Sequence, residues 1–210
     1  MSNEVKTKEK VNLDPKYLIK LTVTLFLTCC VVAGALGAVN MVTEGPIAEI
    51  NKAKTEAAMK AVVADPDNST FSDPLALTDE MTAAAQAGGG SLVEAYAVQV
   101  GGADAGYALK IDAAGSQGII TMMVGLDADG AVTGVSVVKH SETAGIGTKV
   151  MGNEPNNKGV PVLDQFIGKS AADGVLNVGS NVDAITGATV SSKGVTAGVN
   201  AALAVAGVMG

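Results

Sequence analysis

The sequence predicts an α+β protein, in which a single N-terminal transmembrane helix precedes a small domain with an antiparallel β-sheet and flanking helices. Residues 21–39 carry no charge, which is long enough for a helix to cross a bilayer. Segments 119–126 and 132–138 are rich in β-branched residues and flank a short turn, a pattern typical of a β-hairpin. Near the end of the chain, residues 191–208 place apolar side chains at helical spacing.

Composition limits the possible functions. The 210 residues provide one modest domain with an appendage. The net charge is −7 and the chain has no arginine, so nucleic acid is not expected as a partner. The only cysteines, Cys29 and Cys30, are adjacent within the most apolar stretch, and by themselves they do not supply a four-ligand metal or iron–sulfur site. A cofactor must therefore be held in another way, and no metal site is expected.

The N-terminal region predicts a polar cytoplasmic tail over residues 1–17, expected to be disordered, and a transmembrane helix over residues 18–40. Five lysines precede the apolar run, whereas the first charges after it are Glu44 and Glu49. The positive-inside rule then places the N-terminus in the cytoplasm and the following domain outside the cell (inner) membrane. A cleaved signal peptide is the alternative, because residues 33–38 are small, but the apolar core of such a peptide is usually shorter.

Residues 41–90 predict a helical connector followed by a loop. Thr43 to Pro46 resembles a helix start, with proline in the first turn, and residues 47–64 read as a helix that ends before Asp65-Pro66. The rest of this region is turn-rich, with one short helix expected around Asp79–Ala87.

Residues 91–210 form the predicted folded domain. A first hairpin is expected from residues 94–100 and 106–112, and a second from residues 119–126 and 132–138, with Gly130 able to take positive φ in its turn. A polar loop at 153–161 and a short element around Phe166 follow. The last helix has one apolar face, and its glycines weaken it as an isolated helix. The apolar face consists of Val195, Val199, Ala202, Leu203 and Ala206.

The segment Asp183–Ser192 has the composition of an anion site. Gly187 and Ala188 permit a turn and the close approach of a ligand, and hydroxyls follow at the start of the last helix. Free N–H groups and the positive end of the helix dipole suit a phosphate. From these residues alone, a turn followed by a helix cap is the simpler interpretation.

The run Thr186-Gly187-Ala188-Thr189 after Asp-x-Ile resembles the flavinylation motif of the FMN-binding domain family. The resemblance implies that Thr189 carries FMN through a phosphoester bond. Thr186 stands where serine is common in the family. The neighbours implied to surround the phosphate are Thr186, Gly187, Ala188, Ser191 and Ser192.

The run His140-x-Glu-Thr-x-Gly-Ile-Gly is similar to a second motif of the same family, which lies against the flavin ring. From the residues alone, His140 fits no catalytic triad or metal site and is either a hydrogen-bonded loop residue or a ligand contact. Ala144 stands where the family usually has proline, which makes the turn less rigid. The flavin contacts that the resemblance implies are Glu142, Thr143, Ile146, Gly147 and Thr148.

The length, the single span and the motif spacing resemble the G subunits of Rnf complexes, which are ion-translocating ferredoxin:NAD⁺ oxidoreductases. This likeness implies an electron carrier with no catalytic residues of its own, matured by a flavin transferase and assembled with other subunits in the lipid bilayer. The chain has no Gly-x-Gly-x-x-Gly dinucleotide motif. The alternatives are the C subunit of a sodium-pumping NADH:quinone reductase and a non-redox, membrane-anchored binding domain whose hydroxyl cluster only caps a helix.

Overall fold

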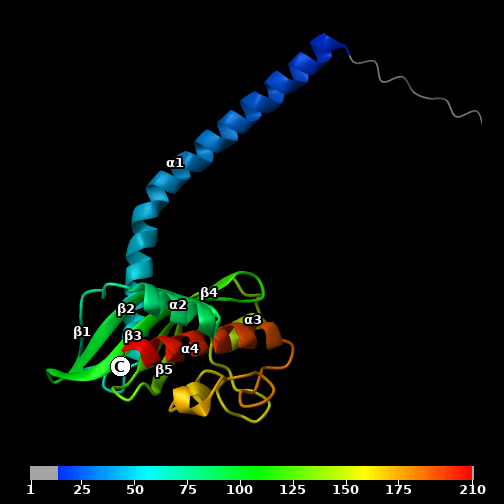
Figure 1. Ribbon diagram of the computed structural model, residues 1–210. Coiled ribbons are helices and arrows are strands. Elements are labelled where there is room, and N and C mark those ends of the chain that lie inside the picture. Colours follow the sequence, from blue (N-terminus) through cyan, green and yellow to red (C-terminus); the bar gives the residue numbers. More distant parts are fainter. Residues whose placement is uncertain (1–13, 210) are drawn as a thin grey trace, which may run out of the picture. The chain divides into compact units, whose positions relative to one another are not determined.

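The computed structural model describes residues 14–209 (Figure 1). This part of the chain falls into two compact units, divided between Ile50 and Asn51. The first helix, α1, comprises Pro15–Ala61 and contributes to both units. Residues 1–13 of the predicted tail lie outside the described part.

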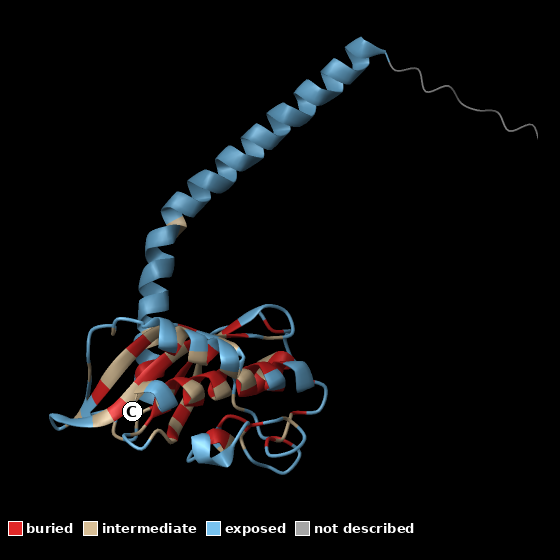
Figure 2. Ribbon diagram, viewed as in Figure 1, coloured by how far each residue is buried: buried red, intermediate tan, exposed pale blue. Residues whose placement is uncertain are grey.

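Helix α1 is the one helix of the described residues that is long and apolar enough to cross a membrane, with a mean hydropathy of 2.1 over its most apolar window. The residues of this apolar window are exposed, including Phe26 at 65%, and Figure 2 shows this part of α1 in the colour of exposed residues. The hydroxyls of Thr22, Thr24 and Thr28 donate to carbonyls one turn earlier, at 2.9, 2.8 and 3.0 Å. Such bonds satisfy hydroxyl groups that lipid cannot, so α1 fits a single-pass membrane anchor.

The prediction of a new helix start at Thr43–Pro46 is wrong, because α1 continues through Pro46. The proline removes one backbone hydrogen bond, but Ala48 and Glu49, which are good helix formers, follow it within the continuous helix. The Thr43 hydroxyl does not cap a new helix and donates backwards to the carbonyls of Val39 (2.9 Å) and Asn40 (3.3 Å). The helix ends at Ala61, before Asp65-Pro66 as predicted.

A five-stranded antiparallel sheet forms the centre of the second unit, with the strands in sequence order (Figure 1). Both predicted hairpins are confirmed: β2 pairs with β3, and β4 pairs with β5. The turn of the second hairpin contains Gly130 at φ +76°, as expected. The edge strand β1 was not predicted. The strands are β1 Ser69–Phe71, β2 Gly90–Val100, β3 Ala103–Ala114, β4 Ile119–Leu126 and β5 Val132–Lys139.

Five helical elements accompany the sheet. The predicted short helix is α2, which ends in a left-handed Gly89, and the predicted last helix is α4, which begins slightly earlier than expected. The short element around the buried Phe166 is η1. The five-residue α3 was not predicted. The bounds are α2 Asp79–Gly88, α3 Gly147–Met151, η1 Asp164–Phe166, η2 Ala171–Asp173 and α4 Thr189–Met209.

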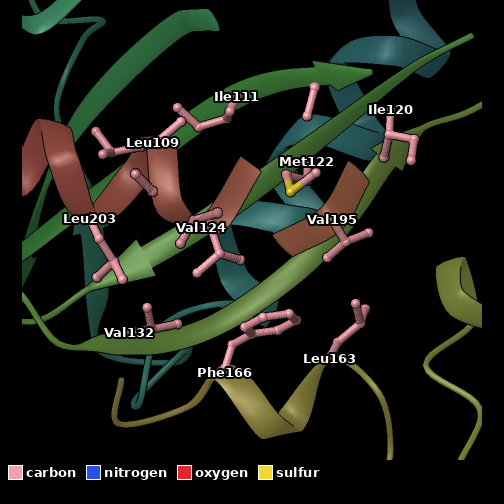
Figure 3. Close-up of a cluster of buried hydrophobic side chains, with 14 of the residues drawn as sticks. Leu109, Ile111, Ile120, Met122, Val124, Val132, Leu163, Phe166, Val195 and Leu203 are labelled. Carbon is pink, nitrogen blue, oxygen red and sulfur yellow. The ribbon is translucent and has the colours of Figure 1, made fainter. Parts of the chain in front are cut away.

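The larger core lies between the sheet and the helices α2 and α4, which pack against each other across one face (Figures 1 and 3). A methyl group at Gly198 of α4 would lie 2.6 Å from the sulfur of Met122, so this glycine allows α4 to approach the sheet closely. The predicted apolar face of α4 is buried, with Ala206 partly so. The side chains in Figure 3 include Leu109, Ile111, Ile120, Met122, Val124, Phe166, Val195 and Leu203.

A second, smaller core covers the opposite face of the sheet. Ala58, Met59 and Val62, at and just after the end of α1, pack against Ala108 and other strand residues there. The Thr133 hydroxyl donates to the Val62 carbonyl at 2.5 Å. The sheet is therefore buried on both faces, and the folded unit includes the last turns of α1.

Candidate functional site

The two segments that the sequence singles out meet at one small pocket. The pocket has a volume of about 150 Å³ and lies where the start of α4 faces the loop between β5 and α3 and the turn between β3 and β4. Its lining residues are Ser116, Glu142, Thr143, Ile146, Gly147, Gly187, Ala188, Thr189, Val190 and Ser191.

Thr189 is the first residue of α4, and its side chain is exposed at the rim of this pocket. The turn before it depends on Gly187 at φ +84°, a conformation that costs other residues roughly 1–2 kcal/mol. The Ala188 N–H donates to the Ile185 carbonyl at 2.9 Å, and both of these side chains are buried. Thr189 thus follows a turn held by buried neighbours, while the residue itself is exposed.

The start of α4 also presents free backbone donors. Its first turn bond runs from the Ser192 N–H to the Ala188 carbonyl, at 2.9 Å. The N–H groups of residues 189–191 make no backbone hydrogen bond within the described part of the chain. These donors and the helix dipole favour an anion at this end of α4.

Glu142 joins the three segments that form the pocket. Its Oε1 accepts hydrogen bonds from the N–H groups of Ser116 (2.8 Å) and Gln117 (3.1 Å), and its Oε2 accepts one from the Ser191 hydroxyl. The residue is only 7% exposed. A methyl group at Gly147 would lie 2.6 Å from Oε2 and 2.8 Å from the Ser191 hydroxyl oxygen. The carboxylate therefore occupies a close-fitting cradle.

The environment keeps this carboxylate ionised. Burial raises the pKa of Glu142, but the hydrogen bonds from Ser191, Gln117 and Ser116 lower it by more, so the net pKa lies below its ordinary value. Hydrogen bonds to the charged form stabilise that form. With both oxygens engaged by the protein, Glu142 holds the pocket walls together.

Most of the predicted site residues meet here. Thr143, Ile146, Gly147, Gly187 and Ala188 line the pocket with Thr189 and Glu142, as does Ser191, whose hydroxyl is used by Glu142.

Three predicted contacts do not line this pocket. Thr186 accepts a hydrogen bond from Asn157 Nδ2 at 2.7 Å. The Ser192 hydroxyl is buried and donates to the Ala188 carbonyl at 3.0 Å, and Thr148 Oγ1 accepts from the Gly145 N–H at 2.8 Å. Their hydroxyl groups stabilise the turns around the pocket.

His140 is exposed and lines a separate groove, beside the end of α1 and β5. Its Nδ1 accepts a long hydrogen bond from the Glu142 N–H, at 3.3 Å. His140 is therefore a hydrogen-bonded loop residue, which is one of the two interpretations that the sequence allowed.

The sequence did not reveal the residues that support the site from a distance. Asn157, Lys158 and Gln165 contact the segment before Thr189, and Ser116 and Val190 line the pocket. Polar residues whose partners lie far away in the sequence leave no periodic pattern in the sequence. Of these five residues, only Val190 could have been predicted, because it is adjacent to Thr189.

These residues fit the attachment of FMN at its phosphate. The pocket is smaller than the roughly 300 Å³ typical of the smallest ligand pockets, so it accommodates the attachment end of the cofactor and not the whole molecule. The exposed hydroxyl, the free N–H groups and the open space at Gly187 suit a phosphoester. Among the described residues, no cluster of three or more His, Cys, Asp or Glu side chains offers a metal site.

The FMN-binding domain family matches residues 115–204, a range that contains every residue lining this pocket, and this match places the domain in a flavin-binding class. The G subunit of a Na⁺-translocating ferredoxin:NAD⁺ oxidoreductase complex from Acetobacterium woodii is 35% identical, over 96% of this chain and 97% of that protein. The chain belongs to the family of G subunits of these ion-translocating Rnf complexes.

Other relatives are G subunits as well. The G subunit of an ion-translocating oxidoreductase complex from Methanosarcina acetivorans is 29% identical over 90% of this chain and 95% of that protein. The G subunit of a proton-translocating ferredoxin:NAD⁺ oxidoreductase complex from Clostridium ljungdahlii is 34% identical over 51% of this chain and 57% of that protein. Relatives of this chain thus belong to complexes named for different coupling ions.

Proposed function

We propose that this chain is the membrane-anchored flavoprotein subunit of an ion-translocating ferredoxin:NAD⁺ oxidoreductase complex, and that it relays electrons through FMN bound covalently to Thr189. The observation that carries the proposal is the exposed Thr189 side chain on the first turn of α4, beside a pocket built from the family's two motifs. The chain itself is an electron carrier within a redox-driven ion translocase.

The attachment needs an activated donor, because an unactivated threonine hydroxyl does not displace a phosphate ester by itself. A flavin transferase using FAD meets this need. The Thr189 Oγ–phosphorus bond forms, the P–O–P bond between the FMN and AMP halves breaks, and AMP leaves. The hydroxyl proton passes to a base on the transferase.

The chain's own residues then hold the phosphate and organise its surroundings. The N–H groups of residues 189–191 and the α4 dipole stabilise the negative charge. Glu142 holds the pocket walls together and keeps its three hydrogen bonds to them. The exposed residues Ile146 and Val190 provide apolar surface at the pocket rim. FMN, when bound, supplies the electron-transfer chemistry, and burial and hydrogen bonding set its potential.

The expected position of the domain outside the membrane gives a reason for a covalent bond to the cofactor. Five lysines precede the span and the first charges after it are acidic, which orients the N-terminus toward the cytoplasm and the flavin domain outward. A reversibly bound cofactor lost outside the cell membrane would not be replaced readily. The partners are the other subunits of the complex, the lipid bilayer and the transferase. The similarity to G subunits across nearly the whole chain favours this assignment over a quinone-reductase C subunit or a non-redox binding domain.

The test is covalent labelling of the full chain. The protein is produced together with a flavin transferase, denatured and separated on a gel, and flavin fluorescence is recorded on the polypeptide. Thr189→Ala removes the acceptor oxygen and is expected to abolish the fluorescence, whereas Thr189→Ser keeps a hydroxyl and retains a measurable part. Thr70→Ala, at an exposed position of β1, is the control. A non-fluorescent wild-type chain, or a fluorescent Thr189→Ala variant, contradicts the proposal.

A further inference from the structure

The segment 183–187 lies outside the helices and strands, and only Thr186 and Gly187 in it are exposed. Side chains of residues 157–165 hold it in place. Asn157 Nδ2 donates to the Thr186 hydroxyl oxygen at 2.7 Å. Lys158 Nζ pairs with Asp183 Oδ2 at 2.8 Å. Gln165, in η1, contacts the backbone of Asp183. We call Asn157, Lys158 and Gln165 the clasp.

Gln165 is the central member of the clasp, because both the oxygen and the nitrogen of its side-chain amide make hydrogen bonds. Its Oε1 accepts from the Asp183 N–H at 2.8 Å, and its Nε2 donates to the Asp183 carbonyl at 2.9 Å and to the Val162 carbonyl at 2.7 Å. These bonds are partly buried. One side chain thus satisfies both backbone polar groups of Asp183, as a neighbouring strand would.

The loop that carries the clasp is itself rigid. Asn153 takes φ +55°, and its side chain bonds Leu163 N–H at 2.6 Å and Asp164 at 2.7 Å. Val162 and Phe166, on either side of Gln165, are buried in the larger core. The clasp is therefore a fixed support whose position follows from core packing.

The clasp and the core together fix the path of the chain into Thr189. Asp183 is held by Gln165, Ile185 and Ala188 are buried, and Gly187 supplies the left-handed turn. Few backbone torsions between these points remain free to change. A group transfer loses rate steeply when the reacting oxygen is displaced, by as much as about 100-fold for 1 Å.

We infer that the clasp is a positioning device for flavin attachment, with Gln165 as its main residue: it holds segment 183–187 in the conformation in which the transferase meets the Thr189 hydroxyl. The inference rests on the proposed function. The clasp residues take no part in the bonds that form and break, and the structure gives them no contact with Thr189 itself.

The experiment measures flavin transfer to the purified full chain in detergent, with FAD and a flavin transferase, as a function of chain concentration. Gln165→Leu keeps the size of the side chain and removes its hydrogen bonds, so kcat is expected to fall at least about tenfold through misplacement of the acceptor. Asn157→Ala removes one exposed contact, and a smaller fall in kcat is expected. Lys158→Arg keeps the charge and is expected to react like wild type, unlike Lys158→Met.

Gln99→Leu is the control with the same substitution, because the Gln99 side chain donates a hydrogen bond to Asp104 at 2.9 Å in the β2–β3 hairpin, which contains no residue of the clasp. Thermal unfolding of every variant identifies a loss of folding, and the exposed Asn157 and Lys158 variants keep the test available if Gln165→Leu unfolds. Wild-type rates, or faster rates, in folded Gln165→Leu and Asn157→Ala overturn the inference. A wild-type chain that accepts no flavin contradicts the proposed function instead.

Discussion

Glu142 shows how a residue of a binding motif serves by holding other parts of the site. Its three hydrogen-bond donors come from the β3–β4 turn and from α4, which approach each other only in the folded chain. Hydrogen bonds to a charged group contribute roughly 1.5–3 kcal/mol each, and their removal leaves buried donors unpaired. Glu142 is therefore central to the stability of the pocket.

This assignment predicts a pH dependence. The pKa of Glu142 is lowered from its ordinary 4.5, so its stabilising contribution is fully present above about pH 4.5 and is lost as the pH falls through the lower, folded-state pKa. Glu142→Gln is expected to lower the free energy of unfolding by about 1–3 kcal/mol at pH 7. The difference from wild type should shrink below pH 4.5.

Thermal unfolding of both full chains at several pH values provides the measurement. All other carboxylates are common to the two proteins, so their titration cancels in the difference. A difference that stays constant down to pH 3, or grows on acidification, contradicts the ionised, stabilising role.

The close fit around this carboxylate predicts a second outcome. Gly147→Ala places a methyl group 2.6 Å from Glu142 Oε2, and overpacking of this kind typically costs about 1–3 kcal/mol. Gly152→Ala, at the other end of α3, meets only the Thr148 carbonyl at 3.3 Å and serves as the control. Chemical denaturation measures both, and equal stability of the two variants would show that the cradle is not close-fitting.

Among the secondary-structure elements, α2 has a side-chain cap at its N-terminus. The Thr78 hydroxyl oxygen accepts a hydrogen bond from the Met81 N–H at 3.2 Å, and α2 packs against α4, which carries Thr189. Thr78→Ala is expected to cost about 1 kcal/mol, which lowers Tm by roughly 2–4 °C in a domain of this size. Thr82→Ala, whose hydroxyl only bonds back to the Thr78 carbonyl, should change Tm little. A neutral Thr78→Ala would mean that the cap does not stabilise α2.

The elements that the sequence predicted are those with strong local patterns. β-Branched residues around Asp127–Gly130 predicted the β4–β5 hairpin, and apolar spacing predicted α4. The three-residue β1 and the five-residue α3 are too short to show a period. Pro46 misled the prediction because a proline on an exposed helix surface removes one hydrogen bond without ending the helix.

The sequence predicted the location of the candidate site but not the role of each residue within it. Motif resemblance brought segments 140–148 and 183–192 together, and the structure places most of their residues around one pocket. Whether a hydroxyl faces a ligand, a carbonyl or a carboxylate depends on long-range packing. For this reason the sequence did not distinguish Ser192, bonded within its helix, from Ser191, bonded to Glu142. The same limit applies to Gln165, whose partner lies 18 residues away.

For the whole molecule, the distribution of charge predicts the topology. From the lysines before the span and the acidic residues after it, we expect the FMN-binding domain to face outward. In bacterial cells producing the full chain, protease added to spheroplasts is expected to degrade the folded domain, whereas protease added to inverted membrane vesicles should leave it intact. Replacement of the five N-terminal lysines by glutamine should yield mixed topology. Protection in spheroplasts would contradict the outward orientation.

The position of Thr189 after α1 and after all five strands of the sheet also bears on the order of events in biosynthesis. A ribosome releases the apolar run of α1 first, and the domain folds around segments that emerge later. The hydrogen bond between Glu142 and Ser191 forms only when α4 has docked on the sheet. On the proposed attachment, flavin would be added only to chains in which α4 has been synthesised and the domain has been moved across the membrane and folded. Each covalently bound flavin would then mark a chain that had crossed the membrane and folded. The flavin content of a preparation would measure the fraction of such chains.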